Sequence, residues 1–357
     1  MNPLVSVVVI FLFGISGQCT LVKQAEQLLK HELDEWVLIP TIVDEWIWAH
    51  RPTAGFIMQK HRSSLSPSNI EFLLYTRRDT DDDGHRLQLG NKNSLINSNF
   101  HPDRPTRIIV HGWQNSKSSP IASSIRDTYL LLWNYNVIVV DWSTCSMHWN
   151  YIRAVGCVPV VGQLLAQLLD ELHQHAGLTM ENVYIIGHSL GAHVAGIAGK
   201  TIENGQLHTI IALDPALPLF SIRNSENRIG PQDAMYVEVI HTNGGLLGFL
   251  HPIGTADFYP NGGTHQPGCG LNVLMCSHSR AWELFVESLQ EPEEKLLASR
   301  VDSLDEIQQD VGGPVLKRSE PNGRNVKRVK MGGEPSSAEH ARGLYSITTR
   351  DKSPFFS

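Results

Sequence analysis

The residues best suited to chemistry lie around Ser189. The run Gly187-His188-Ser189-Leu190-Gly191 has the pattern G-x-S-x-G and stands between a predicted strand, VYII, and a predicted small-residue helix, AHVAGIAG. Such a turn holds a serine in a strained conformation with its hydroxyl above the sheet, and the glycines avoid collisions with neighbouring backbone. The start of the helix also favours developing negative charge. The pattern predicts Ser189 as a nucleophile, although these five residues alone also arise by chance.

A nucleophilic serine needs an acid and a base as partners. After a strand-to-helix turn of this kind, the acid comes next in sequence and the histidine base comes last. Asp214 ends the next apolar strand, HTIIALD, and Pro215 stops strand pairing beyond it. Asp214 is therefore predicted at the same sheet edge as Ser189, and a simple turn cap is the alternative.

Composition cannot select the base, because the chain has 17 histidines. His188 and His193 flank the serine, which is poor geometry for a general base. Four further candidates follow the strand YVEVIHT or end it: His241, His251, His265 and His278. Spacing favours His278, which follows Cys276 closely and precedes the helix-like AWELFVESL, but spacing alone leaves the choice open.

The oxyanion formed by attack on a carbonyl needs two backbone N–H donors. One comes from the residue after the nucleophile, here Leu190, and the other from a loop after an early strand. His111-Gly112-Trp113 ends the apolar strand RIIV, so the N–H of Trp113 is the predicted second donor. An ordinary turn is the alternative for this segment.

The N-terminus contains an apolar run of 12 residues, Leu4 to Ile15, followed by small and polar residues. The run is too short to span a membrane and predicts a secretory signal peptide over residues 1–19, with a buried strand or helix as the alternative. The protein is therefore expected to be secreted.

Secretion would explain the cysteines, which are Cys19, Cys145, Cys157, Cys269 and Cys276. If Cys19 leaves with the signal peptide, the remaining four can form two disulfides in an oxidising compartment. Three pairings are possible, and we favour the local pairs Cys145–Cys157 and Cys269–Cys276. A zinc site is the competing interpretation, but the chain lacks a CxxC pair.

The elements that must position these residues alternate between strands and helices. Short apolar strands are predicted at NIEFLLYTR, 107–113, 136–142, 182–187, 208–214 and 236–242, and helices at 158–177 and 191–200. Continuous apolar strands alternating with helices predict an α/β fold with a mostly parallel sheet covered on both faces. A strand-like pattern returns at 343–356.

The whole chain has 357 residues, 41% of them hydrophobic and 18% charged, with a formal net charge of −7. These values favour a soluble globular protein and give no basic footprint for nucleic acid. Residues 20–68 are expected to be an N-terminal extension and residues 69–357 a single α/β domain. The segment 291–340 is charged, and its basic run 317–330 is expected to be a solvated loop, with a specific contact to anionic lipid as the alternative.

Seven separated motifs resemble those of the pancreatic lipase family, in the same order. They are PTRIIVHGW, VIVVDWS, VYIIGHSLGAHVAG, ALDPA, VEVIHTNGG, DFYPNGG with HQPGC, and CSHSRAWELFVES. The resemblance implies an α/β-hydrolase fold and a triad of Ser189, Asp214 and His278. It also implies a secreted enzyme that hydrolyses acyl esters of glycerolipids without a redox or nucleotide cofactor.

Departures from the family pattern suggest the substrate. Only six residues, Gly270 to Met275, lie between Cys269 and Cys276 where pancreatic-type lipases have a long lid, and the loop from Thr242 to Asp257 is also short. This double shortening resembles insect and venom phospholipases A1, which implies a phospholipid substrate cleaved at sn-1. The alternatives are a triacylglycerol or galactolipid lipase, and a non-catalytic protein like the yolk proteins, which lose triad residues.

Other family features are absent from the sequence. We expect no C-terminal lipid-binding domain and therefore no colipase partner. Val301 and Val311 stand where relatives often have a further cysteine pair. The acidic, calcium-like cluster is incomplete around Arg228, Gly230 and Asp233, so no metal is expected. No transmembrane segment is predicted.

Overall fold

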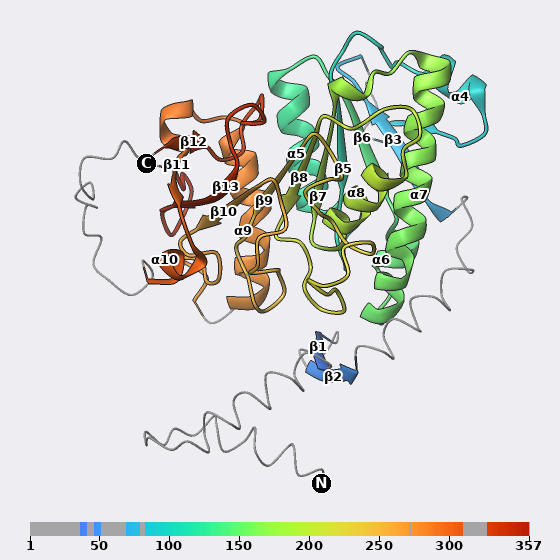
Figure 1. Cartoon of the computed structure of the whole chain (residues 1–357). Helices are drawn as coiled ribbons and strands as arrows, with labels where there is room; N and C mark the ends of the chain where they lie inside the picture. Colours follow the sequence, from blue (N-terminus) through green and yellow to red (C-terminus); the bar gives the residue numbers. More distant parts are fainter. Residues whose placement is uncertain are drawn as a thin grey trace, which may run out of the picture.

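A computed structural model (Figure 1) describes residues 36–40, 46–50, 69–78, 83–270, 273–309 and 327–356. These residues form an 11-stranded sheet in the order β12-β11-β13-β10-β9-β8-β7-β5-β6-β3-β4, and a separate antiparallel pair, β1 (Trp36–Pro40) and β2 (Trp46–His50). The predicted signal peptide and most of the predicted N-terminal extension lie outside the described residues.

The centre of the large sheet is parallel, as predicted. Its seven parallel strands, in spatial order, are β6 (Asn136–Asp141), β5 (Thr106–Val110), β7 (Val183–His188), β8 (Thr209–Leu213), β9 (Tyr236–Ile240), β10 (Ala256–Pro260) and β13 (Gly343–Ile347). Antiparallel strands complete the two edges: β3 (Glu71–Tyr75), β4 (His85–Leu87), β11 (Leu297–Val301) and β12 (Arg328–Lys330).

Helices cover both faces of the sheet (Figure 1). Side chains alternate along each strand, so that in β5 Ile108 and Val110 pack toward α7 (Tyr151–Ala176) and α8 (Leu190–Thr201). Ile109 packs in the other core, with α5 (Pro120–Leu132) and α9 (Val273–Ser288). Burial on both faces explains the unbroken apolar runs of the strands. The short helices are α4 (Lys92–Ile96), α6 (Ser143–Ser146), α10 (Leu304–Gln309), η2 (Met180–Asn182) and η3 (Glu293–Leu296).

The long helix α7 begins seven residues before its predicted start at Val158. The side chain of Asn150 accepts hydrogen bonds at its N-terminus, and Gly177 ends it in the left-handed conformation, with φ of 76°. Among the described helices, α7 is the one long and apolar enough to cross a membrane, but 72% of its apolar stretch is buried inside the protein. Its apolar composition is therefore accounted for by packing in the core.

In the C-terminal segment, the basic run 317–330 was expected to be a solvated loop, and this is wrong at its end, where Arg328–Lys330 form strand β12. Residues 297–309 form β11 and α10, and β12 pairs with β11. Glu334 accepts two hydrogen bonds from Arg107 on β5, at 2.9 and 2.7 Å, and both side chains are buried. The Arg107 guanidinium also lies 3.7 Å from the centroid of the Tyr184 ring. A buried, bidentate ion pair thus anchors this segment to the central sheet; residues 310–326 lie outside the described part of the chain.

Candidate active site

Ser189 occupies a strained turn between β7 and α8. Its φ of 56° and ψ of −121° are unusual for a residue with a side chain. The backbone approaches so closely that a Cβ on Gly191 would lie 2.1 Å from the carbonyl oxygen of Val110, and one on Gly187 would lie 2.4 Å from that of Gly191. The two glycines are therefore required by packing, and the predicted strand-to-helix turn is present.

Asp214 lies directly after β8, the strand that neighbours β7. Its Oδ1 accepts hydrogen bonds from the backbone N–H groups of Thr242, at 2.8 Å, and Asn243, at 2.9 Å. Gly248 packs against the same carboxylate, because a Cβ there would lie 2.4 Å from Oδ1. These contacts satisfy one oxygen of a fully buried carboxylate and direct the other toward His278, so Asp214 is more than a turn cap.

His278, on α9, is the predicted histidine that meets Asp214. Its Nδ1–H donates to Asp214 Oδ2 at 2.5 Å. The bond fixes the tautomer and leaves Nε2 available as a base. His241 is instead buried against Asp257, 2.9 Å away, while His251 and His265 are exposed. Of the four histidines that spacing left open, His278 is the one that forms a hydrogen bond with Asp214.

His188 and His193 contact backbone carbonyls rather than Asp214. His188 Nε2–H donates to the carbonyl of His278 at 3.0 Å, and the two rings lie 4.6 Å apart. Burial, with a smaller effect from His278, holds the pKa of His188 well below its usual value, so its ring is neutral. His193 donates to the carbonyl of Ala216, and burial lowers its pKa to about 3. The contact between His188 and His278 has no signal in the sequence, because 90 residues separate them.

The loop that carries Trp113 packs on Ser189, and Leu190 follows Ser189 directly. The loop after β5 packs so tightly on the serine that a Cβ on Gly112 would lie 2.7 Å from Ser189 Cβ and 3.3 Å from Oγ. The next residue, Trp113, is held by a hydrogen bond from its Nε1 to the carbonyl of His148, at 2.9 Å. Leu190 is the first residue of α8, a position whose N–H has no acceptor within the helix.

The cysteines form the two predicted local pairs. Cys145–Cys157 joins α6 to α7, and Cys269–Cys276 joins the preceding loop to α9, two residues before His278. The zinc interpretation of these four cysteines is therefore wrong. The second disulfide holds the segment that carries His278.

The incomplete acidic cluster does not fit a metal ion. Asp233 accepts hydrogen bonds from the Lys200 ammonium and, at 2.8 Å, from the Gly230 N–H. Arg228 donates to backbone carbonyls nearby, including that of Ile229. A cation already faces the one carboxylate of the cluster, so its oxygens are engaged by protein donors.

A parallel sheet with helices on both faces and a strained serine at the end of a central strand define the α/β-hydrolase fold. The chain belongs to the lipase family, whose profile, described as Lipase, matches residues 44–355. It is similar to a pancreatic triacylglycerol lipase of Myocastor coypus, with 34% identity over 252 residues that cover 64% of this chain and 54% of the relative. It is also similar to lipase member H of Oryctolagus cuniculus, with 35% identity over 230 residues that cover 62% and 49%.

The chain thus spans about half the length of the curated relatives it matches. Among solved structures, alpha/beta hydrolase domain-containing protein 10 from mouse aligns with 14% sequence identity and a TM-score of 0.28, covering 42% of this chain and 73% of that chain.

Proposed function

We propose that the protein is a secreted serine esterase of glycerolipids, and specifically a phospholipase A1 that releases the sn-1 acyl chain of phosphatidylcholine. The observation that carries the proposal is the hydrogen bond of 2.5 Å between His278 and Asp214 next to a strained serine turn. A buried histidine with one nitrogen held by a carboxylate is equipped to accept a proton at the other.

The proposed reaction proceeds through an acyl-enzyme. Ser189 Oγ attacks the ester carbonyl while His278 Nε2 takes its proton, and Asp214 stabilises the resulting imidazolium. The N–H groups of Trp113 and Leu190 bind the oxyanion of the tetrahedral intermediate. The ester C–O bond then breaks, and His278 returns the proton to the leaving lysophospholipid oxygen. Water, deprotonated by His278, attacks the acyl-enzyme, and His278 then returns the proton to Ser189 Oγ as the fatty acid leaves.

The short lid supports a polar head group as the preferred ligand. Of the six residues between Cys269 and Cys276, Val273 to Met275 already belong to α9. The other shortened loop folds back on the site, because the N–H of Asn243 and the backbone of Gly248 contact Asp214. Loops this short bury little apolar surface over the serine and leave room for a phosphate ester.

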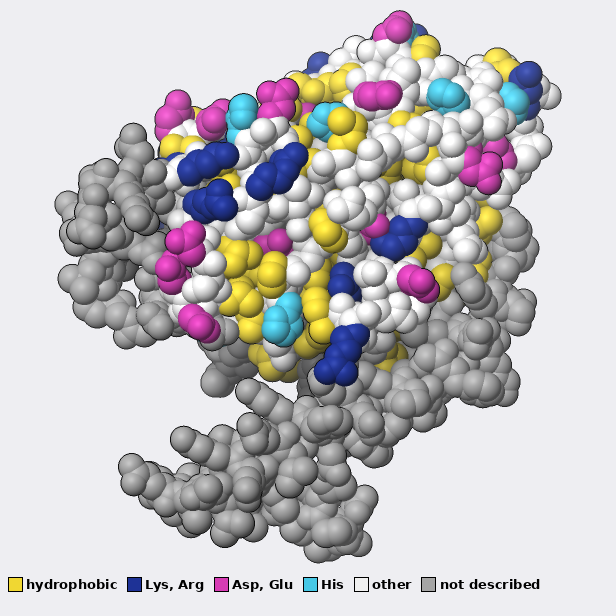
Figure 2. Space-filling model, viewed as in Figure 1, with side chains coloured by type: hydrophobic (Ala, Val, Ile, Leu, Met, Phe, Trp, Pro, Cys, Tyr) yellow, Lys and Arg dark blue, Asp and Glu magenta, His cyan; other side chains and the backbone are white. Residues whose placement is uncertain are grey.

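Exposed apolar side chains around Ser189 support the proposal that the protein acts at a lipid surface. Met147 and Trp149 follow β6, Leu246 follows β9, and Met275 lies in the first turn of α9. The Trp149 side chain, 62% exposed, has the amphipathic character of residues at membrane interfaces. On the face seen in Figure 2, acidic and basic side chains are interspersed and hydrophobic side chains gather in the lower half.

Secretion is part of the proposal and is supported by Cys145–Cys157 and Cys269–Cys276. Disulfides form and persist in oxidising compartments, such as the extracellular space, and are rare in the cytosol.

The test compares two lipids with one enzyme preparation. Purified protein is incubated with phosphatidylcholine carrying distinguishable sn-1 and sn-2 chains, or with a long-chain triglyceride emulsion, and products are identified by mass. We expect lysophospholipid that retains the sn-2 chain, slower triglyceride turnover, and neither product with Ser189→Ala. If triglyceride is cleaved faster and phosphatidylcholine stays intact, the protein is a triacylglycerol lipase and not a phospholipase A1. No Ser189-dependent product from either lipid would contradict the enzymatic proposal.

A further inference from the structure

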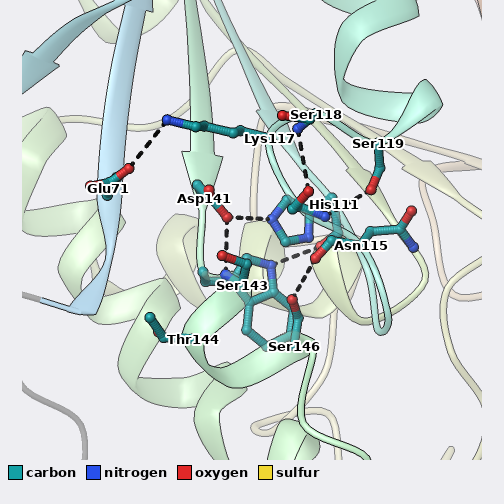
Figure 3. A network of polar contacts seen from close by, with 12 residues as sticks. Glu71, His111, Asn115, Lys117, Ser118, Ser119, Asp141, Ser143, Thr144 and Ser146 are labelled. Atoms are coloured by element: carbon teal, nitrogen blue, oxygen red, sulfur yellow. Dashed lines mark hydrogen bonds and ion pairs between the residues drawn. The ribbon is translucent and has the colours of Figure 1, made fainter. Parts of the chain in front are cut away.

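A further buried histidine–aspartate pair, His111 and Asp141, lies beneath the loop that carries Trp113. Figure 3 shows the His111 ring directed toward Asp141, the last residue of β6. His111 Nε2 is 3.3 Å from Asp141 Oδ1, and His111 Nδ1 is 3.1 Å from the carbonyl oxygen of Gly112. Both side chains are buried. The proposed reaction does not use this pair.

The carbonyl of Gly112 and the N–H of Trp113 are the two ends of one peptide group. A trans peptide is planar, so its carbonyl and N–H point in opposite directions, and holding the carbonyl also fixes the direction of the N–H. A hydrogen bond to the carbonyl further polarises the amide and strengthens its N–H as a donor. The ring of His111 is therefore placed to aim the Trp113 N–H.

The contacts of His111 define what Asp141 contributes. The two atoms that face the ring nitrogens are oxygens, one from the carboxylate of Asp141 and one from the carbonyl of Gly112. Burial alone raises the pKa of Asp141, but the hydrogen bond and charge of His111, with a hydrogen bond from Ser143, lower it overall. Asp141 is thus held as an anion against the ring.

Other contacts hold the same loop. The Trp142 side chain donates through Nε1 to the carbonyl of His111 at 2.9 Å, and the N–H of Gln114 donates to the carbonyl of Ser146. The hydroxyl of Ser146 donates to the carbonyl of Asn115, at 2.8 Å. These bonds fix the ends of the loop, while the ring of His111 reaches the peptide between Gly112 and Trp113.

We propose that His111, held by Asp141, is a positioning residue that orients the Trp113 N–H toward the oxyanion. This proposal rests on the proposed function, because it assigns a role within the same ester hydrolysis. The ring acts through the Gly112–Trp113 peptide, whose carbonyl oxygen it contacts.

The test uses three variants and a soluble ester, p-nitrophenyl butyrate. His111→Phe removes both contacts, His111→Asn keeps an amide N–H near the position of Nδ1, and Asp141→Asn removes the charge. Loss of one oxyanion donor costs about 10²–10³ in kcat. For a misdirected donor we expect roughly 100-fold lower kcat in His111→Phe, partial rescue in His111→Asn and about 10-fold lower kcat in Asp141→Asn, with KM within roughly threefold.

A tetrahedral analogue separates positioning from a merely structural role. A trifluoromethyl ketone adds to the serine as an oxyanion, so its inhibition constant should rise in parallel with the loss of kcat/KM across the variants. His208→Phe is the matched control and should retain the parent kcat. His208 directly precedes β8, at the end of the strand opposite Asp214.

Two outcomes overturn the proposal in distinguishable ways. An active parent whose His111→Asn and Asp141→Asn variants fold and keep kcat and the inhibition constant within twofold contradicts the role of His111, even if His111→Phe fails to fold. A folded parent without Ser189-dependent hydrolysis contradicts the proposed function, and the role of His111 with it.

Discussion

The hydrogen bond from His188 to the carbonyl of His278 ties the residue before the candidate nucleophile to the candidate base. Because the donor is Nε2–H, the structure predicts different effects for two replacements. His188→Phe fills the space without a donor, whereas His188→Gln places an amide N–H near the position of Nε2. Loss of one buried hydrogen bond is worth about 1 kcal/mol, so we expect kcat to fall about 5-fold in His188→Phe.

His188→Gln should recover most of that loss, and KM should change little in either variant. Steady-state kinetics on a soluble ester, with thermal unfolding as a check on the fold, measure both effects. Equal kcat in His188→Phe and the parent would show that the contact does not position His278.

At this scale the sequence predicts some site residues better than others. Ser189 and Asp214 end adjacent parallel strands, so strand patterns and turn chemistry place them together. His278 lies on a helix beyond a further strand, β10, and no periodicity links it to Asp214. The family resemblance, rather than spacing, singled it out. The contact between His111 and Asp141 was not predicted. The two residues lie near the ends of the predicted strands 107–113 and 136–142, and no sequence pattern links one to the other.

At the scale of elements, the two disulfides have different expected effects. Cys269–Cys276 closes a short segment beside His278, whereas Cys145–Cys157 joins two helices of the core. We expect the Cys269→Ser/Cys276→Ser variant to lose activity by about 10-fold, since misplacing a catalytic group by about 1 Å can cost more than that. The Cys145→Ser/Cys157→Ser variant should chiefly lower the melting temperature, because a disulfide typically adds about 2–4 kcal/mol of stability.

Activity, melting temperature and thiol alkylation before and after reduction check this prediction. The native protein should show no reactive thiol at these four cysteines. Labelling of any of them without reductant would contradict the pairing, and equal kinetics in the two double variants would contradict the distinction between them.

Strands that helices cover on both faces could be predicted from the sequence, whereas strands farther from the centre of the sheet were harder to predict. The runs of β5, β6, β7 and β8 are continuously apolar because helices cover both faces. Strand β10 was not predicted, since its sequence ADFYP contains a proline and precedes two glycines, which are turn signals. Its burial arises from β9 and β13, and β13 is far away in sequence.

At the scale of the whole molecule, buried polar contacts attach the C-terminal segment to the sheet. Beside the pair of Arg107 and Glu334, the fully buried Glu238 on β9 accepts hydrogen bonds from Tyr236, at 2.9 Å, and from the Gly332 N–H, at 2.6 Å. Contacts between residues so distant in sequence explain why the composition of this segment did not predict its attachment to the sheet. A charged residue in a polar stretch is typical of a loop unless its buried partner is known.

Glu238 makes stability depend on pH. Burial raises its pKa from 4.5 to about 7, despite the two hydrogen bonds. The folded state therefore favours the protonated acid, so its contribution is complete below about pH 4.5 and is lost as pH rises through about 7. The loss is at most ~3 kcal/mol. Glu238→Gln keeps an acceptor and a neutral side chain, so it should gain stability relative to the parent at pH 8 but not at pH 5.

Urea unfolding of the parent and Glu238→Gln at pH 5 and pH 8 tests this expectation. At each pH, the free energy of unfolding of the parent is subtracted from that of Glu238→Gln. The two differences, at pH 5 and at pH 8, are then compared. A difference that is the same at both pH values would show that Glu238 does not titrate differently in the folded and unfolded states.

The central claim is that Ser189, activated by His278 and Asp214, forms the acyl-enzyme. The most direct measurement is intact mass after reaction with a fluorophosphonate, followed by peptide mapping and by kinetics of Ser189→Ala. We predict one adduct per chain, located on Ser189, no adduct in Ser189→Ala, and a fall in kcat of roughly 10⁴ or more with the fold retained. An adduct on another serine, or near-parent activity in folded Ser189→Ala, would contradict the claim.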